Sequence, residues 1–297
     1  MKLVVILGPT GVGKTATALT IAGRLGVDII NADSRQIYAE LPIGTAAPTE
    51  AQLRQVRHHF VGTLHLNDYY SASMYEQDVL RLLDEMYAHN DTALMAGGSM
   101  MYIDAVCNGI DDIPTVPETI RTEMKRRYET EGLDALLDEL KRLDPEYYDI
   151  VDRHNYRRVV HALEICHTAG QTYTSLRTHA RKERPFRTVK IGLTLPREEL
   201  YDRINRRVDD MIEHGLVDEA RSVYGQRQAN ALNTVGYKEL FDYFDGRWSL
   251  PEAVERIKGN TRRYCRKQLT WFKRDTSITW FNPDDTEGII NRVKSEE

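Results

Sequence analysis

The 297-residue sequence has few cysteines and no long hydrophobic segment. Its three cysteines, Cys107, Cys166 and Cys265, lie far apart and form no C-x-x-C pair. This spacing excludes a zinc ribbon and argues against a disulfide framework, so we expect reduced thiols in a cytoplasmic protein. The apolar run at the N-terminus is five residues long, too short for a signal peptide or a membrane span. We therefore expect no membrane partner.

The sequence also lacks a strong net charge. Its 40 basic and 45 acidic residues give a formal net charge of −5, so the whole molecule does not have the charge typical of a nucleic-acid-binding protein. Basic residues are nevertheless clustered, at Arg153, Arg157 and Arg158, at residues 181–190, and at residues 256–274, where eight Lys or Arg occur without an acid. Such clusters predict a polyanion held at one face, although each is also typical of a solvated helix face.

The N-terminal apolar run, residues 3–7, leads directly into a phosphate-binding sequence. Residues 8–15 match G-x-x-x-x-G-K-[ST], between a predicted strand and a predicted helix. The glycines let several backbone N–H groups point at one anion, and the helix N-terminus adds partial positive charge. Lys14 can reach the outer phosphates, and the Thr15 hydroxyl can hold Mg²⁺. The residues predicted to bind a di- or triphosphate are Gly8, Pro9, Thr10, Gly11, Val12, Gly13, Lys14 and Thr15.

Short apolar runs alternate with helical patterns in the first part of the chain, and hydrophobic residues, 41% of the total, suffice for a buried core. The strands predicted are 3–7, 28–31, 92–96 and 188–193, and the helices are 14–25, 50–56, 73–89, 118–131, 133–143, 155–169 and 197–213. This order predicts an α/β fold with a P-loop NTPase-like parallel sheet flanked by helices. We assign residues 1–114 and 186–297 to this catalytic core and 115–185 to an inserted, mainly helical domain.

Three loops follow the carboxyl ends of the predicted strands, at residues 8–15, 33–38 and 97–101. Because these ends meet at one edge of a parallel sheet, we expect the loops to form one crevice. Asp33 could bind a metal or act as a base there, although Asp at such a position is also typical of a turn. The third strand ends in glycines and lacks the acid that supports Mg²⁺ in nucleoside triphosphatases. This absence favours a diphosphate that leaves over a phosphoryl group that is transferred.

The C-terminal basic tract, residues 261–274, interleaves cations with aromatic residues. Cations can neutralise phosphates and aromatic rings can stack on bases, so the tract is a candidate RNA-binding surface. The alternative is that its apolar residues, Tyr264, Leu269, Trp271 and Phe272, belong to the core.

Several separated motifs in this order resemble the tRNA dimethylallyltransferase family. They are residues 8–15, Asp33–Tyr38 with Ile43–Thr45, Gly97–Ser99 with Tyr102, Arg158 with Ala162–Glu164, Val235–Glu239, and Arg266–Trp271. The resemblance spans nearly the whole chain. It implies transfer of a dimethylallyl group from dimethylallyl diphosphate to N6 of adenosine 37 beside the tRNA anticodon, with release of diphosphate. It also implies Mg²⁺ as cofactor and the anticodon stem-loop of tRNA as partner, and we expect a monomer.

The resemblance further implies roles for individual residues. Asp33 would be the general base, Thr15 the Mg²⁺ ligand, and Lys14 and Arg207 the groups that hold diphosphate. Ser99 stands where the family usually has Thr and would keep a catalytic hydroxyl, whereas His161 stands where we expect Arg. The residues implied to contact tRNA are Asp33, Ser34, Arg35, Gln36, Ser99, Met101, Arg157, Arg158, Val159, Val160, His161, Asn233, Thr234, Val235, Gly236, Tyr237, Lys238, Arg266, Lys267, Gln268, Leu269, Thr270, Trp271, Phe272 and Lys273.

Three other functions stay open at this point. The phosphate loop alone is typical of an ATP-binding small-molecule or nucleotide kinase, against which the missing third-strand acid counts. A nucleotide-driven RNA-binding switch would bind tRNA and form no covalent product. A prenyltransferase could instead act on free adenine nucleotides, but the basic C-terminal tract favours tRNA as the acceptor.

Overall fold

The structure is a computed structural model that describes residues 1–178 and 181–295. The chain divides into two compact units, Met1–Cys107 with Arg184–Glu297, and Asn108–Glu183. The sequence predicted these boundaries after residues 114 and 185, a few residues later in the chain than the structure places them. Arg184 belongs to the first unit because its guanidinium pairs with Glu76 and donates hydrogen bonds to the carbonyl oxygens of Ala105 and Val106.

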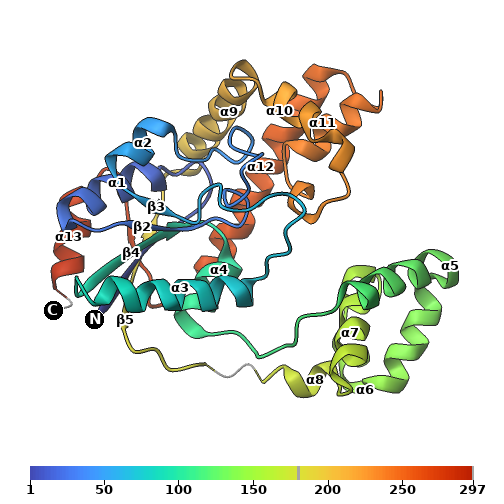
Figure 1. Cartoon of the computed structure of the whole chain (residues 1–297). Coiled ribbons are helices and arrows are strands. Elements are labelled where there is room, and N and C mark those ends of the chain that lie inside the picture. The colour runs from blue at the N-terminus through green and yellow to red at the C-terminus, as the bar shows by residue number, and fades with distance from the viewer. Residues whose placement is uncertain (179–180, 296–297) are drawn as a thin grey trace. The chain divides into compact units, whose positions relative to one another are not determined.

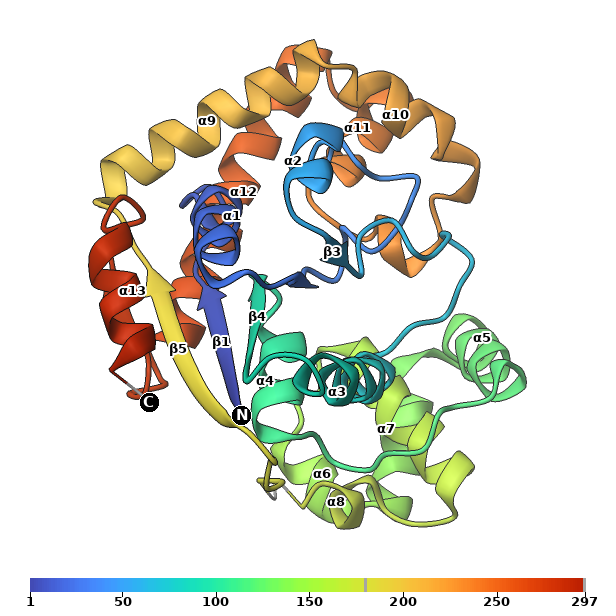
Figure 2. The ribbon, with the colours of Figure 1, turned by 60° about the vertical axis from the view of Figure 1, so that its left-hand side comes forward.

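The first unit is built on a parallel sheet whose strand order, within the described residues, is β3-β2-β4-β1-β5-β6. The strands are β1 (Lys2–Leu7), β2 (Ile29–Ala32), β3 (His58–His59), β4 (Thr92–Gly97), β5 (Arg187–Leu193) and β6 (Thr279–Phe281). The four longer strands confirm the prediction. The two edge strands were not predicted because two or three residues carry too little pattern to recognise. β1 lies inside the sheet beside β5, so the phosphate loop leaves its middle (Figure 2).

Helices cover both faces of the sheet, as the alternating pattern predicted (Figure 1). Successive strand residues point to opposite faces. Val4 and Ile6 accordingly pack with helices α1 and α13, whereas Leu3 and Val5 pack with α3 and α4. The helices of this unit are α1 (Lys14–Leu25), α2 (Glu50–Gln55), α3 (Ala72–Tyr87), α4 (Met100–Asn108), α9 (Arg197–Glu213), α10 (Leu216–Ser222), α11 (Tyr237–Phe244), α12 (Leu250–Phe272) and α13 (Thr286–Lys294), with 3₁₀ turns at Tyr224–Gln226 and Asn230–Leu232.

The second unit is helical and has its own core. Its helices are α5 (Glu118–Leu143), α6 (Pro145–Ile150), α7 (Tyr156–Ala169) and α8 (Tyr173–Leu176). Helix α5 is interrupted at Gly132, whose φ of 82° and ψ of 175° are not helical, where the sequence predicted one helix to end and the next to begin. Asp144 is buried and accepts hydrogen bonds from the backbone N–H groups of Tyr147 and Thr174, which ties α6 to α8.

The cysteines and the lengths of the apolar helices bear on two expectations from the sequence. Within residues 1–178 and 181–295, Cys107, Cys166 and Cys265 are all buried and free of disulfides. No helix in these ranges has the length and apolar character needed to cross a membrane.

Candidate active site

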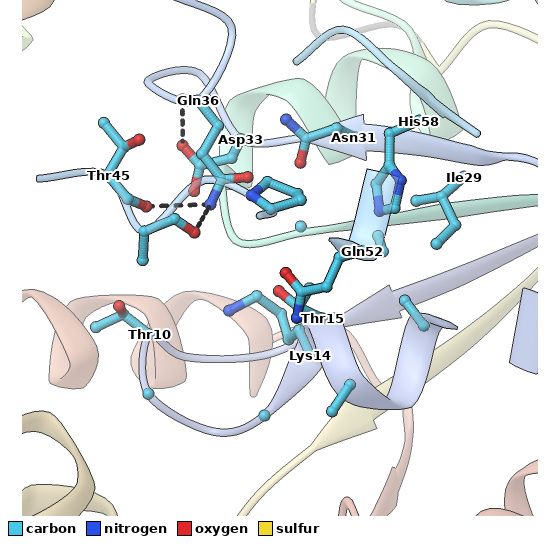
Figure 3. Close-up of a pocket in the computed structure, with 18 of the residues that line it drawn as sticks. Thr10, Lys14, Thr15, Ile29, Asn31, Asp33, Gln36, Thr45, Gln52 and His58 are labelled. Carbon is cyan, nitrogen blue, oxygen red and sulfur yellow. Dashed lines mark hydrogen bonds between the residues drawn. The ribbon is translucent and has the colours of Figure 1, made fainter. Parts of the chain in front are cut away.

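A cavity of about 370 Å³ lies at the carboxyl ends of the central strands. It is lined by the phosphate loop, by the loop that begins at Asp33 and by the end of β4, so the expected convergence of three loops is confirmed (Figure 3). Arg207 of α9 and Tyr264 and Gln268 of α12 also line it, as do Gln52 of α2 and His58 of β3. The site therefore combines residues from both ends of the chain.

The phosphate loop has the backbone that the motif requires. Gly11 and Gly13 have φ values of 84° and 106°, in the left-handed region that favours glycine. Helix α1 begins at Lys14 directly after Gly13, which has no side chain to cap the helix, so its first N–H groups are open to an anion. The predicted phosphate-binding residues that line the cavity are Thr10, Gly11, Gly13, Lys14 and Thr15, whereas the side chain of Val12 packs in the core.

Lys14 and Arg207 bring positive charge to this cavity. The Lys14 ammonium donates to the carbonyl oxygen of Pro9 at 2.9 Å, and burial lowers its pKa to about 8 against the opposing effect of the Asp33 carboxylate. Arg207 donates to the Thr10 hydroxyl, and burial lowers its pKa as well. Its buried Nε has no hydrogen-bond partner among the described residues. Buried cations with unused donors fit a polyanion such as diphosphate.

Thr15 is the residue predicted to hold Mg²⁺, and it lines the cavity next to Lys14. Within the described ranges, no group of three His, Cys, Asp or Glu side chains could hold a metal ion. An ion at Thr15 would therefore draw most of its other ligands from a bound diphosphate and water. This donor set fits Mg²⁺, which usually keeps several waters and binds through few protein groups and substrate phosphates.

Asp33 follows β2, where it forms a turn and lines the cavity; its role as a base or metal ligand stays a prediction. Its Oδ1 accepts hydrogen bonds from the backbone N–H groups of Arg35 at 2.9 Å and Gln36 at 3.4 Å, so it organises its own turn. It also lines the cavity, across from the phosphate loop (Figure 3). The Ser99 hydroxyl accepts from the N–H of Ser34 at 2.8 Å and donates to the Ser34 hydroxyl, so it holds the adjacent residue of this turn.

The missing acid at the end of β4 has a steric cause. A Cβ on Gly97 would lie 2.1 Å from the carbonyl oxygen of Ala32 on β2, and one on Gly98 would lie 2.6 Å from the Gln268 amide nitrogen. Neither position has room for a side chain. The close packing of β4 against β2 and α12 thus leaves no room for the carboxylate that a nucleoside triphosphatase would carry here.

A second cavity, of about 490 Å³, shares part of its lining with the first. Asp33, Thr10 and Arg207 line both cavities, so they lie where the two meet. The residues predicted to contact tRNA that line it are Asp33, Ser34, Arg35, Ser99, Asn233, Thr234, Val235, Gly236, Lys238 and Lys267. An apolar part is formed by Val208, Met211, Leu216, Val235 and Ile257. Most of this apolar wall was not predicted, because these positions form no local motif and only the fold brings them together.

Some residues predicted to contact tRNA have buried side chains, and for those side chains the prediction is wrong. Val159, Tyr237, Gln268 and Phe272 are at most 3% exposed. They lie on the inward faces of their helices, with the spacing expected of a buried helical stripe. Gln268 instead accepts from the N–H of Thr10 and donates to the carbonyl oxygen of Gly98, each at 2.8 Å, and so connects α12 to the phosphate loop.

Other predicted contact residues are exposed. On α7 and α12 the exposed ones are Arg157, Arg158, His161, Arg266, Lys267, Thr270 and Trp271, followed by Lys273; Met101 on α4 is exposed as well. The His161 ring lies 3.5 Å from the Glu164 carboxylate. Tyr264 and Trp271 are exposed, whereas Phe272 is buried and Leu269 packs against the core. The core alternative therefore holds for Leu269 and Phe272, and RNA binding by the exposed residues stays a prediction.

Two cations of the basic cluster at residues 181–190 are buried, whereas Arg181 and Arg187 are exposed. Arg184 forms its ion pair with Glu76, and both side chains are buried. The buried Lys190 ammonium lies 2.6 Å from the carboxylate of Asp275. These cations are neutralised inside the fold, so the cluster does not present them to a polyanion.

Comparison with known proteins agrees with this geometry. The family model described as IPP transferase matches residues 36–275. The chain is 61% identical over 293 residues to tRNA dimethylallyltransferase 1 of Phocaeicola vulgatus, covering 99% of this chain and 98% of the relative. It is 59% identical over 292 residues to the protein of that name from Bacteroides thetaiotaomicron, covering 98% and 95%. The crystal structure of the full-length tRNA isopentenylpyrophosphate transferase from Bacillus halodurans is 36% identical, with a TM-score of 0.70 and 99% of each chain covered. The chain belongs to the IPP transferase family.

Proposed function

We propose that this protein transfers a dimethylallyl group from dimethylallyl diphosphate to N6 of adenosine 37 of tRNA. The observation that carries the proposal is the position of Asp33, where a cavity lined by buried cations meets a second, partly apolar cavity. The first cavity suits a diphosphate, and the second is large enough for a nucleobase. The names of the relatives, which are tRNA dimethylallyltransferases, support the same reaction.

The residues at the junction suit the chemistry of this transfer. Adenine N6 is a poor nucleophile, so a base must take its proton while the new bond forms. As the N6–C1 bond forms, the C1–oxygen bond breaks, the N6 proton passes to the Asp33 carboxylate, and diphosphate leaves with the bonding electron pair. Lys14, Arg207 and the N–H groups of the phosphate loop stabilise the charge that develops on diphosphate. When Mg²⁺ is bound, Thr15 would hold it, and the ion supplies further charge neutralisation.

An adenine stacked in RNA cannot reach a recessed donor, so the base must leave the stack and enter the second cavity. The exposed cations of α12, among them Arg263 and Lys267 at that cavity, would bind the RNA backbone. The exposed Arg157 and Arg158 of the helical unit would bind the anticodon stem-loop in the same way. The buried, unpaired cysteines of the described chain support a cytoplasmic location.

The test is incubation with unmodified tRNA, Mg²⁺ and radiolabelled dimethylallyl diphosphate, with ATP in parallel reactions. We expect label in tRNA, mapped to one adenosine beside the anticodon. Consumption of ATP without label in tRNA would instead favour the kinase. Label in free adenine nucleotides and none in tRNA would identify a different acceptor for the same chemistry.

A further inference from the structure

The loop at residues 41–48 forms a wall of both cavities. Thr45 lines both of them, Gly44 lines the second, and Ala46 and Pro48 line the first. The loop is tightly folded, because the Thr45 hydroxyl donates to the carbonyl oxygen of Leu41 at 2.6 Å. Ala46 has a φ of 53°, an unfavourable conformation for a residue with a side chain. Such a conformation persists only where surrounding contacts enforce it.

Glu219 of α10 holds the loop at Ile43 and Gly44. Its two carboxylate oxygens accept hydrogen bonds from the backbone N–H groups of Ile43 at 2.7 Å and Gly44 at 2.8 Å. The Tyr237 hydroxyl donates to the same carboxylate at 2.6 Å. Burial, and next the Glu219 charge, raise the pKa of Tyr237, so its hydroxyl stays a donor. Hydrogen bonds to a carboxylate are stronger than those between neutral groups.

Tyr237 also explains why the loop contains a glycine. A Cβ on Gly44 would lie 2.5 Å from the Tyr237 hydroxyl oxygen. The ring is completely buried, so it could not move aside to admit a side chain at this position. Glu219 and Tyr237 therefore hold the loop backbone directly.

Gln36 connects the next two residues of the loop, Thr45 and Ala46, to the carboxylate of Asp33. Its side-chain amide donates to the carbonyl oxygens of Thr45 at 3.1 Å and Ala46 at 3.0 Å, and its backbone N–H donates to Asp33 (Figure 3). Hydrogen bonds at both ends of the segment Ile43–Ala46 thus connect Glu219, through the loop backbone and Gln36, to Asp33. A carboxylate that must meet the N6 proton of adenine depends on such support, because catalytic geometry tolerates little displacement.

We propose that Glu219, together with Tyr237, is a positioning residue that clamps the loop at residues 41–48 and through Gln36 fixes the Asp33 carboxylate for proton transfer. This inference rests on the proposed function, in which Asp33 is the base. It gives Tyr237 a role inside the protein in place of the tRNA contact that the sequence predicted.

The test uses Glu219→Gln and Tyr237→Phe in the full-length protein. The amide of Glu219→Gln turns a donor toward one of the loop N–H groups, whereas Tyr237→Phe removes one hydrogen bond and keeps the ring. The matched control is Asp218→Asn, which removes an exposed carboxylate from the same helix. With saturating donor and tRNA, we expect single-turnover transfer to fall about 10- to 100-fold in Glu219→Gln, less in Tyr237→Phe, and to stay unchanged in the control.

A double-mutant cycle separates positioning from a general loss of structure. If Glu219 acts through Asp33, then Glu219→Gln combined with Asp33→Asn loses less activity than the product of the two single effects. A merely structural role gives independent effects, together with weaker tRNA binding and a lower Tm. If Glu219→Gln does not fold, Tyr237→Phe supplies the same cycle.

The outcomes also separate this inference from the proposed function. Wild-type protein that transfers no label contradicts the proposed function, and the role of Glu219 with it. Active wild-type protein together with Glu219→Gln and Tyr237→Phe variants that retain its single-turnover rate contradicts the positioning role alone.

Discussion

The Asp33 carboxylate has a structural and a chemical task, and a useful substitution must separate them. Its Oδ1 accepts hydrogen bonds from Arg35 and Gln36, so removal of the whole group would also disturb the turn. Asparagine keeps an oxygen in the same place and cannot take a proton from adenine N6. Asp33→Asn is therefore a sharper probe of base catalysis than Asp33→Ala.

We expect Asp33→Asn to lower the rate of transfer by about 10²-fold or more, the usual scale of general base catalysis. Its affinity for tRNA should stay close to that of the wild type, because the turn is retained. Single-turnover labelling and filter binding measure the two quantities. Near-normal turnover by Asp33→Asn would contradict the role of Asp33 as the base. A loss of tRNA binding equal to the loss of rate would show that Asp33 contributes to tRNA binding.

Residues with local sequence signals could be placed at the cavity from the sequence, whereas most contacts between distant parts of the chain could not. The phosphate loop is a continuous motif between a strand and a helix, and Asp33 directly follows a strand, so both could be identified. Gln268 contacts Thr10 across 258 positions, and Glu219 contacts Ile43 across 176. No local pattern encodes such pairs. The same limit explains why Gln268 was assigned to tRNA instead of to the phosphate loop.

At the scale of an element, α12 has a buried face and an exposed, basic face. Its buried residues recur every three or four positions and include Thr261, Cys265, Gln268 and Phe272. Its exposed residues include Arg263, which lies at the second cavity. The sequence left open whether the tract binds RNA or belongs to the core, and the periodicity of the helix separates its buried residues from its exposed ones.

We expect Gln268→Leu to weaken binding of the donor and to leave tRNA affinity nearly unchanged. The substitution leaves the half-buried N–H of Thr10 and the buried carbonyl oxygen of Gly98 without their partner, and the buried group alone costs about 1–3 kcal/mol of stability. Chemical denaturation and titration with inorganic diphosphate and Mg²⁺ measure both effects. The contrasting variant is Arg263→Glu with Lys267→Glu, which should weaken tRNA binding and flatten its salt dependence. If Gln268→Leu instead weakens tRNA binding and leaves diphosphate binding unchanged, Gln268 belongs to the RNA-binding surface.

At the scale of the whole molecule, the insertion leaves and rejoins the core at adjacent points. The core ends at Cys107 and resumes at Arg184, whose guanidinium donates to the carbonyl oxygens of Ala105 and Val106. A change from alternating strands and helices to helices alone was enough to predict this insertion. The sequence placed its boundaries only approximately, because they are set by the contacts of Arg184 and not by the composition of the linkers.

This geometry predicts that the core can fold without the helical unit. Residues 108–183 can be replaced by a short Gly-Ser linker, since the ends to be joined already meet. We expect the shortened protein to unfold cooperatively and to bind diphosphate, because Lys14, Thr15 and Arg207 all lie in the first unit. Its tRNA affinity should fall, with a shallower dependence on salt, because the exposed Arg157 and Arg158 are lost.

The matched control is Arg157→Glu with Arg158→Glu in the full-length chain, which removes the charges and keeps the helices. Calorimetric titration with diphosphate and tRNA binding over a series of salt concentrations measure both proteins. If the two variants lose tRNA affinity to a similar extent, the helical unit contributes mainly through these cations. Unchanged tRNA binding in the shortened protein would place the whole RNA-binding surface on the core, and α12 would then carry most of it.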